Sequence, residues 1–243
     1  MLCTQRTNTD VIAGVGRMIA DPQPASYASR VGRPQVFDTD EVIDMAMHLF
    51  WEHGYARTTP QMLTDELGIG KGSLYHSFGS KHNLFTLALQ RYYDNRVNAI
   101  TQTLSGKGPV LPRLRKIMIV LTGVGGHRRG CFIVNTVGEL ANPDERVARA
   151  ATDLFDMITA EFTSAIERGR GSGEFVGQTD PPKAARELLA TMIGISVLAK
   201  VDSDHRKLLR AIDEALDALA APSRTTRAPR KRISSTATMK MRG

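Results

Sequence analysis

Residues 71–81 carry a run of side chains that can donate hydrogen bonds to an anion, namely Lys71, Ser73, Tyr75, His76 and Lys81. A lysine in the first turn of an exposed helix is unfavourable by about 0.3–1 kcal/mol, because the helix macrodipole is positive there. Gly72 inside a short helix costs up to about 1 kcal/mol relative to alanine. Bare N–H groups at a helix start beside a lysine suit a phosphate oxygen. These residues therefore indicate a surface for a polyanion rather than a merely solvated polar face.

Two short helices joined by a glycine turn must position these donors. Thr59 can cap the first helix, and Pro60 fits its first position because that nitrogen needs no partner. Gly68 can take the positive φ of a helix stop, and Ile69 can fill the corner from inside. The second helix opens near Lys71, and its buried side consists of Leu74 and Phe78. This is the outline of a helix-turn-helix.

An additional helix and a basic arm come before this pair. Asp38 and Glu41 form a possible capping box for a helix that ends at Gly54. Just upstream, the basic residues around Arg33 can reach a minor groove or phosphates. An ordinary linker explains the arm equally well. Trp51, the single tryptophan, is expected to pack in this head or against the next domain.

The ordered motifs of this region resemble the tetracycline-repressor (TetR) family of bacterial transcription regulators over residues 37–89. The motifs are Gly54-Tyr55, Thr58-Thr59, Gly68-Ile69, Lys71-Gly72, Leu74-Tyr75-His76, Phe78 and Ser80-Lys81. The resemblance implies an all-α fold: a three-helix DNA-binding head at residues 30–93, and a helical body at 94–221 that dimerises and binds a small effector. The family often has serine or threonine at the position of Gly70, so one hydroxyl cap or phosphate contact is expected to be absent.

The proposed DNA contacts divide into two groups. Phosphate contacts are expected from Lys71, Tyr75, Lys81 and either Thr58 or Thr59. Base edges are expected to be read by Ser73 and His76. Gly72 and Arg33 complete the candidate DNA-binding set.

Charge and composition narrow the class of protein. The net charge is +7, and residues 222–243 contain seven basic residues and no acid, so the remaining chain is neutral overall. That tail and residues 1–29 are expected to be disordered; the tail either strengthens nonspecific DNA binding or only aids solubility. The two cysteines form neither a disulfide framework nor a zinc site, and no apolar run spans a membrane. We expect a cytoplasmic protein, nucleoid-associated when bound, without a cofactor or metal.

The body offers a candidate effector wall. Cys131, Asn135 and Glu139 recur every four residues and would share one helix face. Met192, from an apolar helix, is a further candidate. The alternative interpretation is a solvent-facing stripe.

Cys131 is also a candidate for chemistry of its own. It lies at a helix start and follows His127, Arg128 and Arg129, and both features lower the pKa of a thiol. Its thiolate could react with oxidants or electrophiles, although a buried inert cysteine is the more ordinary interpretation.

The last two expected helices, at about 181–199 and 204–219, supply the predicted dimer interface. The first is apolar in all directions, so it needs partners on both sides. With their two-fold copies, the two helices would form a four-helix bundle. Alternatively, they only complete the monomer core.

The sequence therefore favours a homodimeric repressor that binds a near-palindromic operator and is released by a small-molecule effector or by thiol modification. The first alternative is an architectural DNA-binding protein without an effector. An enzyme on the helical body is disfavoured because the chain has no His-Glu-x-x-His motif, metal-ligand cluster, nucleophile elbow or phosphate loop.

Overall fold

The computed structural model describes residues 37–126, 129–141, 144–175 and 180–220. These residues form helices and contain no strand, which confirms the predicted all-α class. The helices are α2 (Thr39–His53), α3 (Pro60–Leu67), α4 (Lys71–Phe78), α5 (Lys81–Leu104), α6 (Leu111–Thr122), α7 (Phe132–Leu140), α8 (Glu145–Gly171), α9 (Pro181–Leu198) and α10 (His205–Ala220). None of them is both long and apolar enough to cross a bilayer, within the described ranges.

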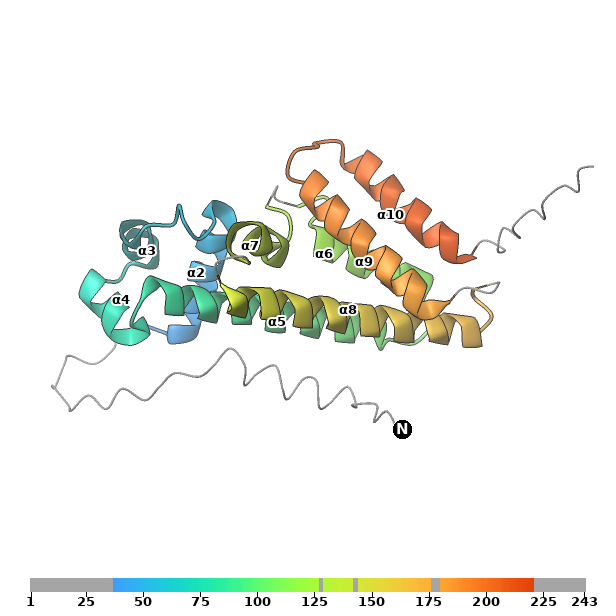
Figure 1. The fold of residues 1–243 in the computed structure, drawn as a ribbon, viewed down its shortest axis with the longest axis horizontal. Helices are drawn as coiled ribbons and strands as arrows, with labels where there is room; N and C mark the ends of the chain where they lie inside the picture. Colours follow the sequence, from blue (N-terminus) through green and yellow to red (C-terminus); the bar gives the residue numbers. More distant parts are fainter. Residues whose placement is uncertain (1–36, 127–128, 142–143, 176–179, 221–243) are drawn as a thin grey trace, which may run out of the picture.

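A head and a body share the long helix α5. Figure 1 shows α2, α3 and α4 gathered at one end, while α5 extends from this end into the body and runs alongside α8 there. α9 packs on α8 and α10 packs on α9, farther from the head. α7 lies between the head and the rest of the body, so it is well placed to connect the two.

The helix starts follow the expected local chemistry in several places. Thr59 caps α3 by accepting a hydrogen bond from the Met62 N–H at 3.1 Å. Ser80 caps α5 through the Asn83 N–H at 3.0 Å. Asp38 caps α2, but its carboxylate accepts from the Asp40 N–H. For α10, the carboxylate of Asp204 accepts from the first-turn N–H groups of Arg206 and Lys207.

The start of α6 is capped by a residue from a distant part of the chain. The helix begins at Leu111, and Val110 at its N-cap position makes no side-chain cap bond of its own. Instead, the carboxylate of Glu174 accepts hydrogen bonds from the N–H groups of Val110 and Leu111, at 2.6 and 2.7 Å. A residue 64 positions away therefore supplies the cap.

Candidate nucleic-acid interface

α4 is held to the head by two side chains and presents the others to solvent. Only Leu74 and Phe78 are buried, at 2% and 5% exposure. The exposed residues are Lys71, Gly72, Ser73, Tyr75 and His76. Lys71 makes no hydrogen bond or ion pair with any described residue. A solvent-facing row of unpaired donors is the arrangement that groove and phosphate contacts require.

The glycines around α4 occupy their positions for different physical reasons. Gly68 ends α3 with φ of 63°, as the turn requires. Gly70 starts α4 without a side-chain cap bond, as its lack of a hydroxyl implies. A Cβ on Gly72 would meet nothing within 4 Å. The packing around α4 therefore does not require glycine at 72.

Thr58 requires a correction. Its side chain is fully buried, at 0% exposure, and its hydroxyl donates to the Gly54 carbonyl at 2.6 Å. It therefore fixes the turn between α2 and α3 and cannot contact DNA from this position. Thr59 is exposed and uses its hydroxyl oxygen for the α3 cap. Arg33 lies outside the described residues.

Lys81 is engaged within the protein. Its ammonium donates to the Tyr55 carbonyl at 2.8 Å and lies 4.2 Å from the centre of the Tyr55 ring. Burial lowers the pKa of Lys81, and the nearby charge of Glu139 partly offsets this. One of its three N–H groups is thus committed, and a phosphate contact by the others stays a prediction.

Glu139 was predicted to line an effector cavity, and this prediction is wrong because its carboxylate binds the backbone of the head. Its carboxylate accepts hydrogen bonds from the Tyr55 and Ala56 N–H groups, at 3.0 and 2.6 Å. A Cβ at Gly54 (φ 79°) would lie 2.9 Å from the same carboxylate. The backbone after α2 is therefore clamped between a carboxylate of α7 and the ammonium of Lys81.

Two further contacts join the head to the body. The Trp51 indole N–H donates to the Gly130 carbonyl at 3.1 Å, which confirms that this tryptophan packs against the body. His82 lies 3.3 Å from the Asp144 carboxylate. Burial raises the pKa of Asp144, but hydrogen bonds and charge from Arg146, together with the charge of His82, hold it below its ordinary value.

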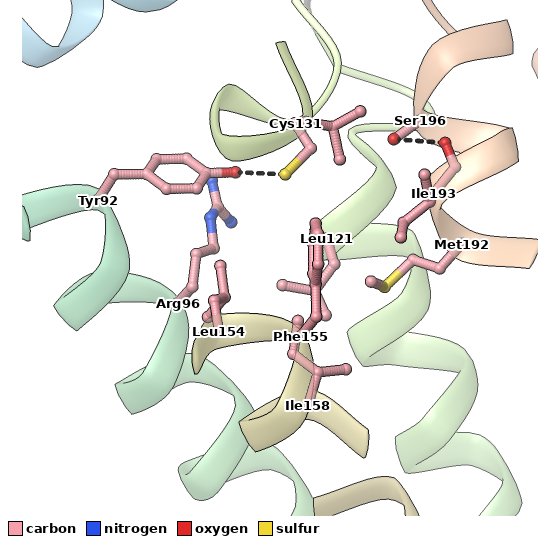
Figure 2. A pocket seen from close by; sticks show the side chains of 11 residues that line it. Tyr92, Arg96, Leu121, Cys131, Leu154, Phe155, Ile158, Met192, Ile193 and Ser196 are labelled. Atoms are coloured by element: carbon pink, nitrogen blue, oxygen red, sulfur yellow. Dashed lines mark hydrogen bonds between the residues drawn. The ribbon is translucent and has the colours of Figure 1, made fainter. Parts of the chain in front are cut away.

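The body contains a narrow cavity near the start of α7. Its volume is about 10 Å³, which is room for roughly one water molecule. Figure 2 shows its lining, which consists of Tyr92, Arg96, Leu121, Cys131, Val134, Leu154, Phe155, Ile158, Met192, Ile193 and Ser196. The cavity therefore contains two of the four candidate effector residues, Cys131 and Met192.

Asn135, like Glu139, lies outside this lining, so the expected common wall is wrong. Its amide donates to the Arg129 carbonyl at 2.7 Å and accepts from Lys200 at 3.0 Å. Cys131 is the N-cap residue of α7, and its carbonyl accepts a hydrogen bond from the Asn135 N–H at 3.0 Å. Tyr92 and Arg96 also line the cavity and were not among the predicted site residues, although their spacing of four on α5 was a usable signal.

Two family models cover most of the described chain. One, for the N-terminal domain of the bacterial regulatory proteins of the tetR family, matches residues 42–88. The other, for the tetracyclin repressor-like C-terminal domain, matches residues 110–215. The chain belongs to the TetR family. As a TetR-family member, it is a DNA-binding transcriptional regulator.

Individual relatives agree with this assignment. The uncharacterized HTH-type transcriptional regulator YezE of Bacillus subtilis is 31% identical over 195 residues, covering 78% of this TetR-family chain and all of YezE. The HTH-type transcriptional repressor ComR of Escherichia coli is 27% identical over 184 residues, covering 74% of this chain and 87% of ComR.

Solved structures show the same architecture. A cysteine mutant of the TetR family transcriptional regulator CifR, in complex with 26-bp double-strand operator DNA, is 26% identical with a TM-score of 0.67. The match covers 77% of this chain and 100% of CifR. The reduced form of Escherichia coli NemR is 23% identical, with a TM-score of 0.66. The match covers 76% of this chain and 97% of NemR, and it supports the fold alone.

Proposed function

We propose that this regulator is a homodimeric repressor that places its two α4 helices in successive major grooves of a near-palindromic operator, about 34–36 Å apart. One observation carries the proposal: α4 exposes an unpaired lysine, serine, tyrosine and histidine while only Leu74 and Phe78 face the head. The names of the relatives, a repressor in ComR and an operator complex in CifR, support it.

The exposed residues receive separate roles. Lys71, Tyr75 and Thr59 contact phosphates, and a remaining N–H of Lys81 can add another contact. Ser73 and His76 reach base edges. Gly72 lets the backbone of α4 come close to the DNA because it carries no side chain.

The dimer interface is proposed on α9 and α10, at about residues 181–199 and 204–219. One face of α9 packs on α8, yet small and apolar residues lie exposed along the other side. Val197, Leu198 and the following Val201 are 49%, 50% and 76% exposed. Ala190 and Gly194 continue this exposed stripe. Burial of such a stripe against its two-fold copy would stabilise the dimer.

Effector release is proposed to pass through α7. Its first turn borders the cavity at Cys131, and its last turn holds the head through Glu139. A ligand larger than one water must push the cavity walls apart, so it binds better to a conformer with α7 displaced. That differential affinity shifts the heads away from the spacing of the two grooves.

Selection of genomic DNA fragments by the purified protein, followed by sequencing, tests the proposed function. The expected result is a near-palindromic motif bound by one dimer, measured by fluorescence anisotropy and light scattering. Recovery of fragments without a common motif, together with protein that no compound releases, would favour the architectural alternative. We further propose that the protein acts without turnover, and a substrate screen that detected catalysis would contradict this.

A further inference from the structure

The guanidinium of Arg96 forms part of the cavity wall and has no anionic partner among the described residues. Its central carbon lies 4.5 Å from the centre of the Tyr92 ring and 5.5 Å from that of Trp51. Its Nε is buried and makes no hydrogen bond. Figure 2 shows the guanidinium pointing toward the Tyr92 hydroxyl and Cys131. The contacts that this charge makes are therefore aromatic faces, not acceptors.

Such an arrangement is incomplete on physical grounds. An arginine guanidinium in a protein stays charged at every physiological pH, and its N–H groups need hydrogen-bond acceptors. Arg96 as a whole is only half-buried, but its Nε–H is buried, and burying a charged donor without an acceptor is unfavourable. Cation–π contact with Tyr92 and Trp51 offsets only part of this penalty. An acceptor from outside the chain would complete the site.

The surroundings of Arg96 add positive potential. α7 begins next to it, and the N-cap residue Cys131 makes no side-chain cap bond. The Phe132 N–H is directed to the Tyr92 hydroxyl, at 3.3 Å. A second guanidinium, that of Arg129, lies 4.5 Å from the Trp51 ring. The Arg129 guanidinium lies outside the cavity lining, so the helix start and the guanidinium of Arg96 are the features that favour an anion at this end of the cavity.

The other end of the cavity is apolar. Its walls are side chains of α6, α8 and α9, namely Leu121, Leu154, Phe155, Ile158 and Met192. A ligand that suits both ends has an anionic head group and a short apolar tail. The bidentate geometry of a guanidinium fits a carboxylate.

We propose that the effector of this protein is a small organic carboxylate, bound through its carboxylate by Arg96 and through its tail by the apolar end of the cavity. This inference rests on the proposed effector release and adds the chemical class of the ligand. Insertion of the tail separates α7 from α8 and α9, because the cavity otherwise has room for only about one water.

Titration of the full-length protein with octanoate and 4-phenylbutanoate, and with the two matched amides, tests the proposal. Trp51 is the only tryptophan, and its ring centre lies 5.1 Å from that of Tyr92, so its fluorescence reports on the site. Calorimetry gives independent affinities. The acids are expected to bind at least about tenfold more tightly than the amides, because a charge-assisted pair is lost in each amide.

Arg96→Met keeps an apolar stem similar to that of arginine and removes the charge. This variant should lose the preference for acids over amides, whereas Arg149→Met, an exposed arginine on α8, should keep it. Arg96→Lys should keep a reduced preference because the charge remains without the planar fork. Thermal melts verify folding, and we expect no loss of stability in Arg96→Met since an unpaired charge is removed.

Equal binding of acids and amides, retention of the preference in Arg96→Met, or no binding of either acid would each overturn the proposal. Operator binding, measured in parallel by anisotropy, separates this failure from failure of the proposed function. If the protein binds its operator but binds neither acid, the proposed ligand class is refuted and the proposed repressor function still stands. Acid binding without operator release would instead refute release through α7 and leave the carboxylate site intact.

Discussion

Replacement of Lys71 by alanine should change the salt dependence of operator binding more than any other property of the protein. Lys71 is exposed in the first turn of α4 and has no hydrogen bond or ion pair with the described residues. Its loss therefore removes a phosphate contact without breaking an internal one. The free energy of unfolding should change by no more than about 0.5 kcal/mol, as is usual for such surface substitutions.

The size of the effect follows from counterion release. Each lost phosphate contact lowers the slope of log affinity against log salt by about 0.9, so a dimer with two substituted heads loses about 1.8. Between 50 and 200 mM salt, the affinity of Lys71→Ala should then fall roughly tenfold less than that of the unsubstituted protein. Because a phosphate carries no sequence information, binding to unrelated DNA should weaken similarly.

Fluorescence anisotropy over this salt range, with operator and with scrambled DNA, measures the slope directly. Lys107→Ala is the matched control, since Lys107 is an exposed lysine in the loop after α5. A slope that is the same in Lys71→Ala and in the control would refute the role of Lys71 in phosphate binding.

Three further substitutions separate stability from function. Gly72→Ala should stabilise the protein by up to about 1 kcal/mol and raise Tm by about 2–4 °C, since its Cβ meets open space, yet weaken operator binding; unchanged affinity would contradict the close-approach role. Glu139→Ala should lose about 1 kcal/mol in urea unfolding, allowing for solvent exposure, and weaken release by ligand, unlike Glu167→Ala, an exposed control on α8. Because the pKa of Asp144 is lowered on folding, its stabilisation is present above about pH 4 and lost as pH falls. Asp144→Asn should therefore be less stable at neutral pH and lose less stability on acidification; identical pH profiles would refute this.

The sequence predicted the head well because its signals are local. A threonine followed by proline, a glycine at a helix stop and two apolar residues one turn apart determine α3, the turn and α4 almost alone. These features involve neighbours within four residues, so hydrogen-bond geometry and backbone conformation suffice to place them. The exposure of Lys71, Tyr75 and His76 follows directly, because Leu74 and Phe78 select the buried side.

The sequence could not assign partners to polar residues that act across the fold. Thr58 and Thr59 are adjacent and chemically identical, yet one is buried against Gly54 and the other is exposed. Glu139 suited a cavity wall by its spacing, but its carboxylate holds the backbone of the head instead. In the same way, the cap of α6 comes from Glu174 rather than from a neighbouring residue.

The sequence alone therefore determined the family, most of the helices and the exposed face of α4 that we propose meets DNA, since these depend on short-range periodicity and backbone chemistry. Only the tertiary structure decided that Tyr92, Arg96 and Cys131 share a cavity and that the two ends of α7 contact the cavity and the head. The reason is geometric: a carboxylate or guanidinium accepts any suitable partner, and packing of distant helices selects which one lies within reach.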